Sequence, residues 1–195
     1  MPATRRQTMG TVASLHVGNA KKAPTTSVPS LTLTFAGIVS DRHCGPTRAA
    51  GAREPAFRRG TLLANLRQVS LVSMEELIII ASRMGLKRLE PGWLAANIAV
   101  EGAGPIAQIP RGTVLRFPSG ASLYISDINS PCRAAANLIR RCAGVPERQT
   151  SKFVWHSLGR RGLVAFVYVE GDVYARDSIE FLFPRPELPN CTPLP

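Results

Sequence analysis

Short segments of β type, each bounded by glycine, proline or polar residues, recur along the whole chain and restrict its fold more than any other feature. Residues 11–17 (TVASLHV) and 31–35 (LTLTF) alternate as half-buried strands do. Residues 67–72 (RQVSLV) add another strand, and 112–117 with 121–126 flank a Pro-Ser-Gly turn as a hairpin. This pattern predicts a mainly β fold, a closed or nearly closed β-barrel with a few peripheral helices.

Two helices are indicated by their end signals. Ser73 and Glu76 form the Ser-x-x-Glu pattern of a capping box, and Gly85 is placed to end the helix that they begin. A second helix is expected to begin at Ser130 and to end at Gly144. Both helices are short, which suits elements at the periphery of a barrel.

The remaining segments are less regular. Residues 40–60 are rich in arginine, glycine and proline and show no apolar period, so we expect a long irregular loop, which is usually functional or disordered. Residues 162–183 predict two strands joined around Glu170-Gly171-Asp172. Residues 184–195 hold five prolines in twelve positions and are predicted to lack regular structure.

The formal net charge is +11, and the first sixty residues hold nine Lys or Arg against only Asp41 and Glu54, so an anionic partner is expected near that end. Nucleic acid is the less favoured partner, because aromatic residues are few and none alternates with the arginines as a base-stacking surface requires. A phosphate-bearing small molecule fits at least as well. A basic surface with no specific ligand stays an alternative.

The sequence shows neither a membrane-spanning run nor a secretory signal. The most apolar run, residues 77–81, is too short to span a bilayer, and no secretory segment precedes the domain. The four cysteines have irregular separations, so we expect reduced thiols and a cytoplasmic protein.

Cys132 is the strongest candidate for a reactive residue. With Ser130 as N-cap and Pro131 as the first helical residue, Cys132 is predicted at the second helical position, where the helix dipole and the adjacent Arg133 stabilise a thiolate. Cys142 falls in the last turn of the same helix, where a neutral thiol is expected. The alternative is that Cys132 is only a small buried apolar residue.

Five blocks in order resemble the MOSC domain, a family named for the C-terminal part of molybdenum cofactor sulfurases. They are GIVSDRH (37–43), RQVSL (67–71), PGWLAANIAV (91–100), GTVLRF with LYISDINSPC (112–132), and GRRGLVAFVYVEGDVYARDSI (159–179). The resemblance divides the chain into an N-terminal extension (1–9), a MOSC domain (10–183) and the proline-rich tail (184–195).

The resemblance implies a molybdenum cofactor, that is, a molybdenum-binding pterin (molybdopterin), or sulfur carried as a cysteine persulfide. Cys132 would be the catalytic residue and the metal ligand or sulfur carrier. The residues expected to bind the cofactor are Asp41, Arg42, His43, Arg67, Gln68 and Asn97. An ordinary structural role is the alternative for each of them, such as carboxylate pairing for the arginines and backbone bonding for the amides.

The implied activity is that of an oxidoreductase that reduces N-hydroxylated small molecules with electrons from a separate protein. The alternative is a sulfur carrier or a cofactor-binding module without turnover, served by a sulfur-donor protein. Pyridoxal phosphate is not expected, because it belongs to the aminotransferase-like domain of the full-length sulfurases. The chain departs from the family pattern at Ala95-Ala96, where the family has Gly-Glu, and this change puts catalysis in question.

Overall fold

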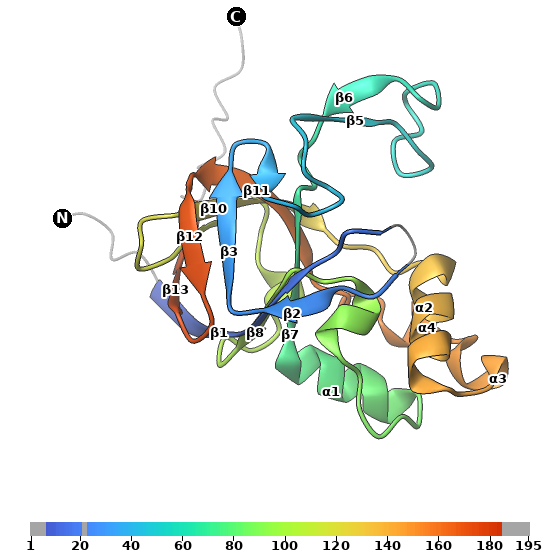
Figure 1. Ribbon diagram of the computed structural model, residues 1–195. Coiled ribbons are helices and arrows are strands. Elements are labelled where there is room, and N and C mark those ends of the chain that lie inside the picture. Colours follow the sequence, from blue (N-terminus) through green and yellow to red (C-terminus); the bar gives the residue numbers. More distant parts are fainter. Residues whose placement is uncertain (1–6, 21–22, 185–195) are drawn as a thin grey trace, which may run out of the picture.

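A closed barrel of seven strands forms the body of the molecule (Figure 1). The computed structural model describes residues 7–20 and 23–184. Around the barrel the strands follow one another as β13 (Ser178–Leu182), β9 (Val114–Arg116), β10 (Ser122–Ile128), β11 (Leu163–Val169), β7 (Val69–Ser73), β8 (Ile98–Glu101) and β1 (Gln7–Val17). The predicted mainly β fold with a closed barrel is confirmed.

The barrel closes because β1 pairs on both of its sides. Its first half is antiparallel to β13, with Thr11 opposite Ser178, and its second half is antiparallel to β8, with Leu15 opposite Ile98. β7 and β8 run parallel to each other, and β2 (Thr26–Val28) adds a short strand outside β1. Closure leaves the barrel without open edges along these strands.

The interior is filled by aliphatic side chains from every barrel strand. Val12, Leu71, Ile98 and Leu123 are fully buried there. A second buried cluster lies between the barrel and the helices and includes Phe153.

A small sheet of β12 (Gly171–Tyr174), β3 (Ser30–Thr34) and β4 (Gly37–Ile38) covers one side of the barrel. Leu31 and Leu33 of β3 point into the barrel core, which confirms the alternation in this strand. The prediction of two strands in residues 162–183 was wrong, because the chain turns at Glu170 and forms β12 on this separate sheet before β13 returns to the barrel.

The loop predicted for residues 40–60 is also partly structured. β5 (Thr47–Ala49) pairs with β6 (Leu62–Ala64) as a hairpin that projects from the barrel in Figure 1. Strands of three residues carry too little alternation to be recognised in a sequence, which is why this hairpin was not predicted.

The helices pack on one side of the barrel. α1 (Met74–Arg83) begins at Ser73, whose hydroxyl accepts from the N–H of Glu76 at 3.2 Å, and it ends before Gly85 in the left-handed conformation. Glu76 does not complete the capping box. Its Oε2 instead accepts from the N–H of Ala107 at 3.3 Å.

Five further elements of the described chain are helical. α2 (Arg133–Ala143) ends at Gly144 as predicted, and α3 (Glu147–Thr150) and α4 (Phe153–His156) follow it. The 3₁₀ turns are η1 (Pro91–Leu94) and η2 (Ile106–Gln108). In residues 7–20 and 23–184, no helix has the length and apolar character needed to cross a membrane.

The predicted domain boundaries stay predictions. β1 already begins at Gln7, within the predicted extension. Of the proline-rich tail, all residues after Pro184 lie outside the described part of the chain.

Candidate functional site: an arginine-lined cavity at Cys132

A cavity of about 490 Å³ opens between the β5–β6 hairpin, the barrel and the start of α2. Five arginines line it, namely Arg42, Arg48, Arg53, Arg67 and Arg161, together with His43 and the thiols of Cys44 and Cys132. None of the described residues that line this arginine-lined cavity is acidic. The cavity therefore presents guanidinium donors and sulfur to whatever enters it.

Cys132 is the N-cap of α2, and its predicted position inside the helix was wrong. Its backbone is extended (φ −147°, ψ 162°), and helical geometry begins only at Arg133. Its side chain is half-buried and makes no capping hydrogen bond. The sulfur still lies at the N-terminal end of the helix, where unpaired N–H groups and the dipole favour negative charge.

Asn129 explains why the chain stays extended up to Cys132. Its N–H donates to the carbonyl of Gly162 at 2.9 Å, and its Nδ2 donates to the hydroxyl of Ser70 at 3.0 Å. Arg53 adds bonds to Asn129 Oδ1 (3.3 Å) and to the carbonyl of Ser130 (3.1 Å). These contacts fix the segment before the helix, so Ser130 is not free to act as its cap.

Gly162 is required for that anchor. Its φ is +92°, and a Cβ added there would lie 1.9 Å from the carbonyl oxygen of Leu71. Only glycine lets β11 begin this close to β7 and still present its carbonyl to Asn129.

Arg161 is the most deeply buried of the five arginines, with 7% of its surface exposed. Its Nη2 donates to the carbonyl of Leu94 at 2.6 Å, whereas its Nη1 has no hydrogen-bond partner among the described residues. Burial lowers the pKa of Arg161 to about 10; Cys132 opposes this shift, and Arg53 and Arg67 add to it. The three guanidinium groups and the sulfur therefore act on one another across the cavity.

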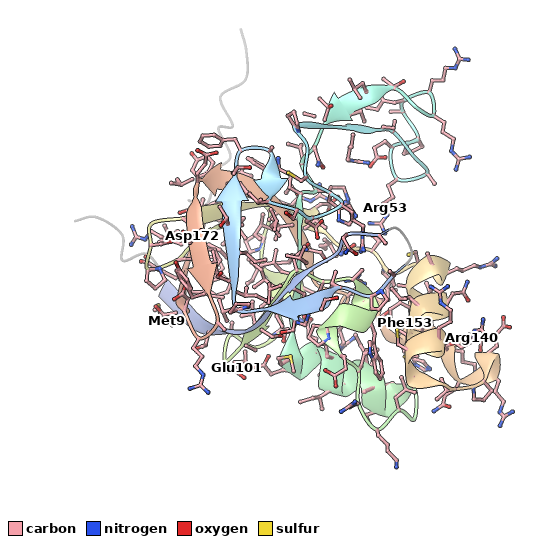
Figure 2. All side chains as sticks on the ribbon, in the orientation of Figure 1. Met9, Arg53, Glu101, Arg140, Phe153 and Asp172 are labelled. Atoms are coloured by element: carbon pink, nitrogen blue, oxygen red, sulfur yellow. The ribbon has the colours of Figure 1, made fainter. Side chains whose placement is uncertain are left out.

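Arg53 lies in the loop that connects β5 to β6, and Arg67 follows β6. Figure 2 shows Arg53 where the hairpin approaches the rest of the molecule. Arg67 Nη2 lies 3.5 Å from Asn129 Oδ1 and its Nη1 lies 3.9 Å from Asp127 Oδ2. Burial, followed by the charge of Arg53, lowers the pKa of Arg67 to about 10. Like charges are thus held together without full compensation.

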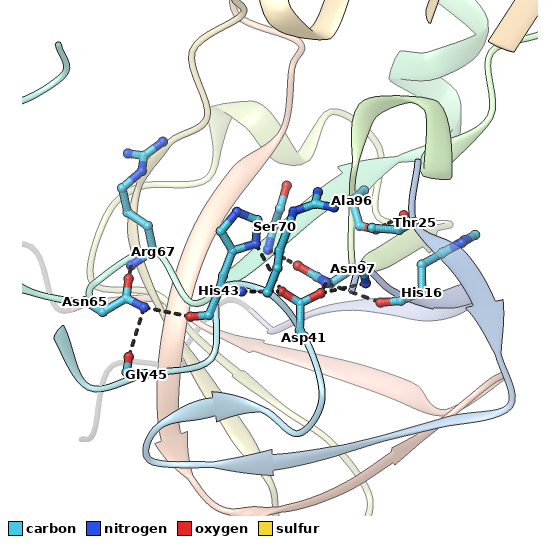
Figure 3. A network of polar contacts seen from close by, with 12 residues as sticks. His16, Thr25, Asp41, His43, Gly45, Asn65, Arg67, Ser70, Ala96 and Asn97 are labelled. Carbon is cyan, nitrogen blue, oxygen red and sulfur yellow. Dashed lines mark hydrogen bonds and ion pairs between the residues drawn. The ribbon is translucent and has the colours of Figure 1, made fainter. Parts of the chain in front are cut away.

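Asp41 is the centre of a buried hydrogen-bond network that lies beside the cavity and not in its lining (Figure 3). Its carboxylate accepts from the N–H groups of Gly18 and His43, each at 2.8 Å, and from Asn97 Nδ2 at 2.9 Å. The ring Nδ1 of His43 lies 3.1 Å from Asp41 Oδ1. Burial acts to raise the pKa of Asp41, but the bonds from His43 and Gly18 outweigh it and the pKa is lowered.

Asn97 and Gln68 also bond within the fold. Asn97 Oδ1 accepts from the N–H of Ser70 at 3.0 Å, and its Nδ2 also reaches the carbonyl of His16 at 3.2 Å. Gln68 donates to the carbonyl of Phe35 and accepts from the N–H of Val167. A direct contact of Asp41, Gln68 or Asn97 with a cofactor stays a prediction, because none of the three lines the cavity.

Arg42 and His43 do line the cavity, as do Arg67 and Cys132. Arg42 Nη1 donates to the carbonyls of Ala20 (2.8 Å) and Ala23 (3.3 Å) and so ties the segment after β1 to the site. The structure thus brings together four of the seven predicted residues.

The departure from the family pattern at Ala95-Ala96 is now located. Ala96 is fully buried in the cluster between barrel and helices and does not line the cavity. Ala95 does line it, with a left-handed backbone (φ 55°, ψ 37°) that glycine adopts at lower cost. Position 96, where the family pattern has the glutamate, therefore lies outside the lining of the cavity in this chain.

Sequence reasoning missed Arg48, Arg53, Arg161 and Asn129. The arginine-rich loop was predicted to be functional or disordered, but no local signal separates its arginines that line the cavity from those that do not. Arg160 and Arg161 are adjacent, and only Arg161 is buried in the cavity wall.

Comparisons with known proteins agree with this architecture. The MOSC domain family model matches residues 58–180. A relative from Bacillus subtilis (strain 168), YuaD, named as a candidate metal-sulfur cluster biosynthesis protein, is 41% identical over 166 residues, which are 85% of this chain and 86% of YuaD.

Solved structures give the same result. The crystal structure of the Bacillus subtilis YuaD protein has a TM-score of 0.89 at 37% identity and covers 93% of this chain and 100% of its own. The Escherichia coli YiiM structure has a TM-score of 0.59 at 16% identity, covers 89% of this chain and 70% of its own, and shows the fold alone. From the family match and its YuaD relative, the chain belongs to the MOSC domain family.

Proposed function

We propose that the cavity binds a molybdenum cofactor through Cys132 and that the protein reduces N-hydroxylated small molecules with electrons from a separate donor protein. One observation carries the proposal: the half-buried sulfur of Cys132 and five guanidinium groups line a single cavity, and the buried Arg161 has an Nη1 without a hydrogen-bond partner among the described residues.

The residues present fit such a group. A thiolate is a soft ligand suited to a transition metal, and guanidinium groups are the preferred donors to the phosphate that a pterin cofactor carries. Within the described residues, no cluster of three or more His, Cys, Asp and Glu side chains could hold a metal ion. Cys132 would therefore be the protein's ligand, and the other ligands would belong to the cofactor.

The roles of the protein residues follow from their positions. When bound, the cofactor supplies the metal that exchanges electrons with the N–O group of the substrate. Arg161, Arg67 and Arg53 hold anionic groups, and Arg42 fixes the segment above them. With Nδ1 of His43 against Asp41, the imidazolium form of His43 would donate from Nε2 the proton that leaves with the hydroxyl oxygen as water. The second proton, taken up by the nitrogen of the substrate, would come from solvent.

A second candidate function is that Cys132 carries sulfur as a persulfide delivered by a sulfur-donor protein. Two observations favour it. The YuaD relative is named for metal-sulfur cluster biosynthesis, and the Cys132 side chain makes no capping bond that would hinder its attack on a donor. For either function we propose a reducing compartment, the cytoplasm, because Cys44, Cys132 and Cys142 are free thiols.

Molybdenum and pterin analysis of protein purified from a cofactor-competent host tests the first function. We expect both in the wild type and neither in Cys132→Ser. Cys142→Ser is the matched control, because that thiol lies in the last turn of the same helix and burial raises its pKa.

The second step is an assay of N-hydroxylated substrates with a supplied electron donor. Wild-type protein that holds no molybdenum would contradict cofactor binding. Protein that holds the cofactor but reduces no substrate would contradict the reductase activity. Salt-sensitive binding to DNA or RNA by metal-free protein would favour a nucleic-acid function instead.

A further inference from the structure

The arginine-lined cavity contains more positive charge than the fold itself requires. Arg48 is paired with Glu54, and Asp127 lies near Arg67. Arg161 and Arg53, by contrast, bond only to neutral groups, namely the carbonyls of Leu94 and Ser130 and the amide of Asn129. These two guanidinium groups have no carboxylate within ion-pair distance among the described residues.

Arg161 is the more informative of the two. With only 7% of its surface exposed, it has lost most of its hydration, and its Nη1 gains no hydrogen bond from the described residues in return. A buried donor in this state is costly unless a ligand satisfies it. The ligand that suits paired guanidinium groups is a compact oxyanion with several acceptor oxygens.

The same cavity wall carries a nucleophile. Cys132 and Arg161 both line the cavity. An oxyanion held by Arg161 and Arg53 would therefore lie in the same cavity as the sulfur. Sulfate and phosphate have the right charge but no atom that a thiolate could take from them.

We infer that the cavity accepts a sulfur oxyanion of the thiosulfate class, holds its oxygens on Arg161 and Arg53, and transfers its terminal sulfur to Cys132. The inference rests on the second candidate function, sulfur transfer, and is independent of cofactor binding. It names a small anionic sulfur source where that function names only a donor protein.

The step balances without a further reactant. The Cys132 thiolate attacks the terminal sulfur of thiosulfate, and a new sulfur–sulfur bond forms on the cysteine. The sulfur–sulfur bond within thiosulfate breaks, and its electron pair leaves with sulfite. Sulfite leaves as a dianion, whose charge the guanidinium groups stabilise as it develops. The persulfide can then pass its outer sulfur to an acceptor nucleophile.

The test uses metal-free full-length protein and thiosulfate labelled in its terminal sulfur. We expect labelled protein heavier by one sulfur atom, release of sulfite, and production of thiocyanate when cyanide is the acceptor. Cys132→Ser should abolish all three signals, whereas Cys142→Ser should leave them unchanged. Sulfate and phosphate should inhibit competitively without transferring anything.

Arginine variants separate anion binding from a structural role. Arg161→Gln should raise the KM for thiosulfate by about tenfold to a hundredfold, the range for one charge-assisted hydrogen bond, with a smaller effect on kcat. The same variant should react normally with a neutral organic trisulfide. Arg160→Gln is the adjacent control. If Arg161→Gln fails to fold, the KM of Arg53→Gln for thiosulfate provides a second test, because the Arg53 side chain is exposed and its replacement is expected to leave the fold intact.

The outcomes are distinct. Sulfur transfer from the trisulfide but not from thiosulfate, or an Arg53→Gln variant with an unchanged KM for thiosulfate, would overturn the inference and leave sulfur transfer as a function. Transfer from neither donor by protein that binds molybdenum would overturn the inference and support the first proposed function. Transfer from neither donor by protein that binds no molybdenum would overturn both.

Discussion

Two groups of buried polar side chains lie next to each other in this protein and differ in one respect. In the Asp41 network, the carboxylate accepts from Gly18, His43 and Asn97, and Asn97 also bonds to strands β1 and β7 through His16 and Ser70. In the arginine-lined cavity, Arg161 Nη1 has no partner among the described residues. The Asp41 carboxylate is hydrogen-bonded by other parts of the fold, whereas Arg161 in the cavity wall has a donor that no described residue accepts.

The difference separates structural from functional polarity. Asp41 and Asn97 are 56 positions apart, and their bond ties the turn after β4 to the start of β8. A satisfied network of this kind fixes geometry. An unsatisfied, like-charged group lowers stability, and a fold retains it where a ligand completes it.

The largest expected effect comes from breaking the satisfied network. Asp41→Ala leaves the buried N–H of Gly18 without its acceptor and removes one of the two bonds from Asn97 Nδ2, so the free energy of unfolding should fall by about 3–5 kcal/mol in a urea titration. Asp172→Ala is the control, because its exposed bond to Thr32 is expected to contribute less than about 0.5 kcal/mol. A loss of less than about 1 kcal/mol for Asp41→Ala would remove the contrast between the two groups.

Glu76 is an intermediate case, because Oε2 has a partner and Oε1 has none among the described residues. Burial, opposed by the bond from Ala107 and by Arg160, raises the pKa of Glu76 from 4.5 to about 7. Between pH 4.5 and about pH 7, Glu76 therefore keeps its proton in the folded state and loses it in the unfolded state. The contribution of Glu76 to stability is complete below pH 4.5 and is lost as the pH rises to about 7.

Glu76→Gln should remove this decline. From the pKa shift, wild-type protein should lose about 3 kcal/mol of unfolding free energy between pH 4.5 and pH 8 that the variant retains. Denaturant titrations across this pH range measure the difference, and Glu101→Gln on the surface serves as the control. Parallel pH profiles for Glu76→Gln and wild type would show that this carboxyl is ionised in both states.

Arg161→Met sharpens the comparison directly. Because burial of an incompletely paired guanidinium is costly, we expect the unfolding free energy to change by no more than about 1 kcal/mol, in contrast to Asp41→Ala. Added sulfate should raise the melting temperature of the wild type and not that of the variant, since a ligand stabilises only the form that binds it. A loss as large as that of Asp41→Ala would make Arg161 a structural residue.

The smallest effect is expected at Ala95, between the two groups. Its φ of 55° is the left-handed conformation, so Ala95→Gly should raise the unfolding free energy by up to about 1 kcal/mol. Ala96→Gly should lower it, because that methyl group is fully buried. Thermal unfolding of the two variants measures whether each change raises or lowers the stability. A lower melting temperature for Ala95→Gly would contradict the proposed backbone strain at Ala95.

The sequence predicted the elements whose signals are local. The alternation at β3, the Ser73 cap and the glycines after α1 and α2 each act within a few residues, and the structure confirms them. Cys132 was placed at the correct end of α2 but two positions too far inside it. The error arose because Asn129, held by Ser70 and Gly162, keeps the preceding segment extended.

The candidate site was predicted only in part for the same reason. The order of motifs identified Arg42, His43, Arg67 and Cys132, which line the cavity. It also gave Asp41, Gln68 and Asn97, whose bonding within the fold depends on partners from distant strands. It could not rank Arg161 above Arg160, because burial of one neighbour and not the other is decided by packing.

By itself, therefore, the sequence determined a barrel of short strands, its helix ends and a cysteine at a positive helix terminus, because alternation, capping and charge are properties of neighbouring residues. Only the tertiary structure decided that β1 closes the barrel against β13, and that arginines from position 42 to position 161 line one cavity with Cys132. The strand pairing and the cavity lining both depend on contacts between segments far apart in the chain, and the pattern of neighbouring residues does not predict such contacts.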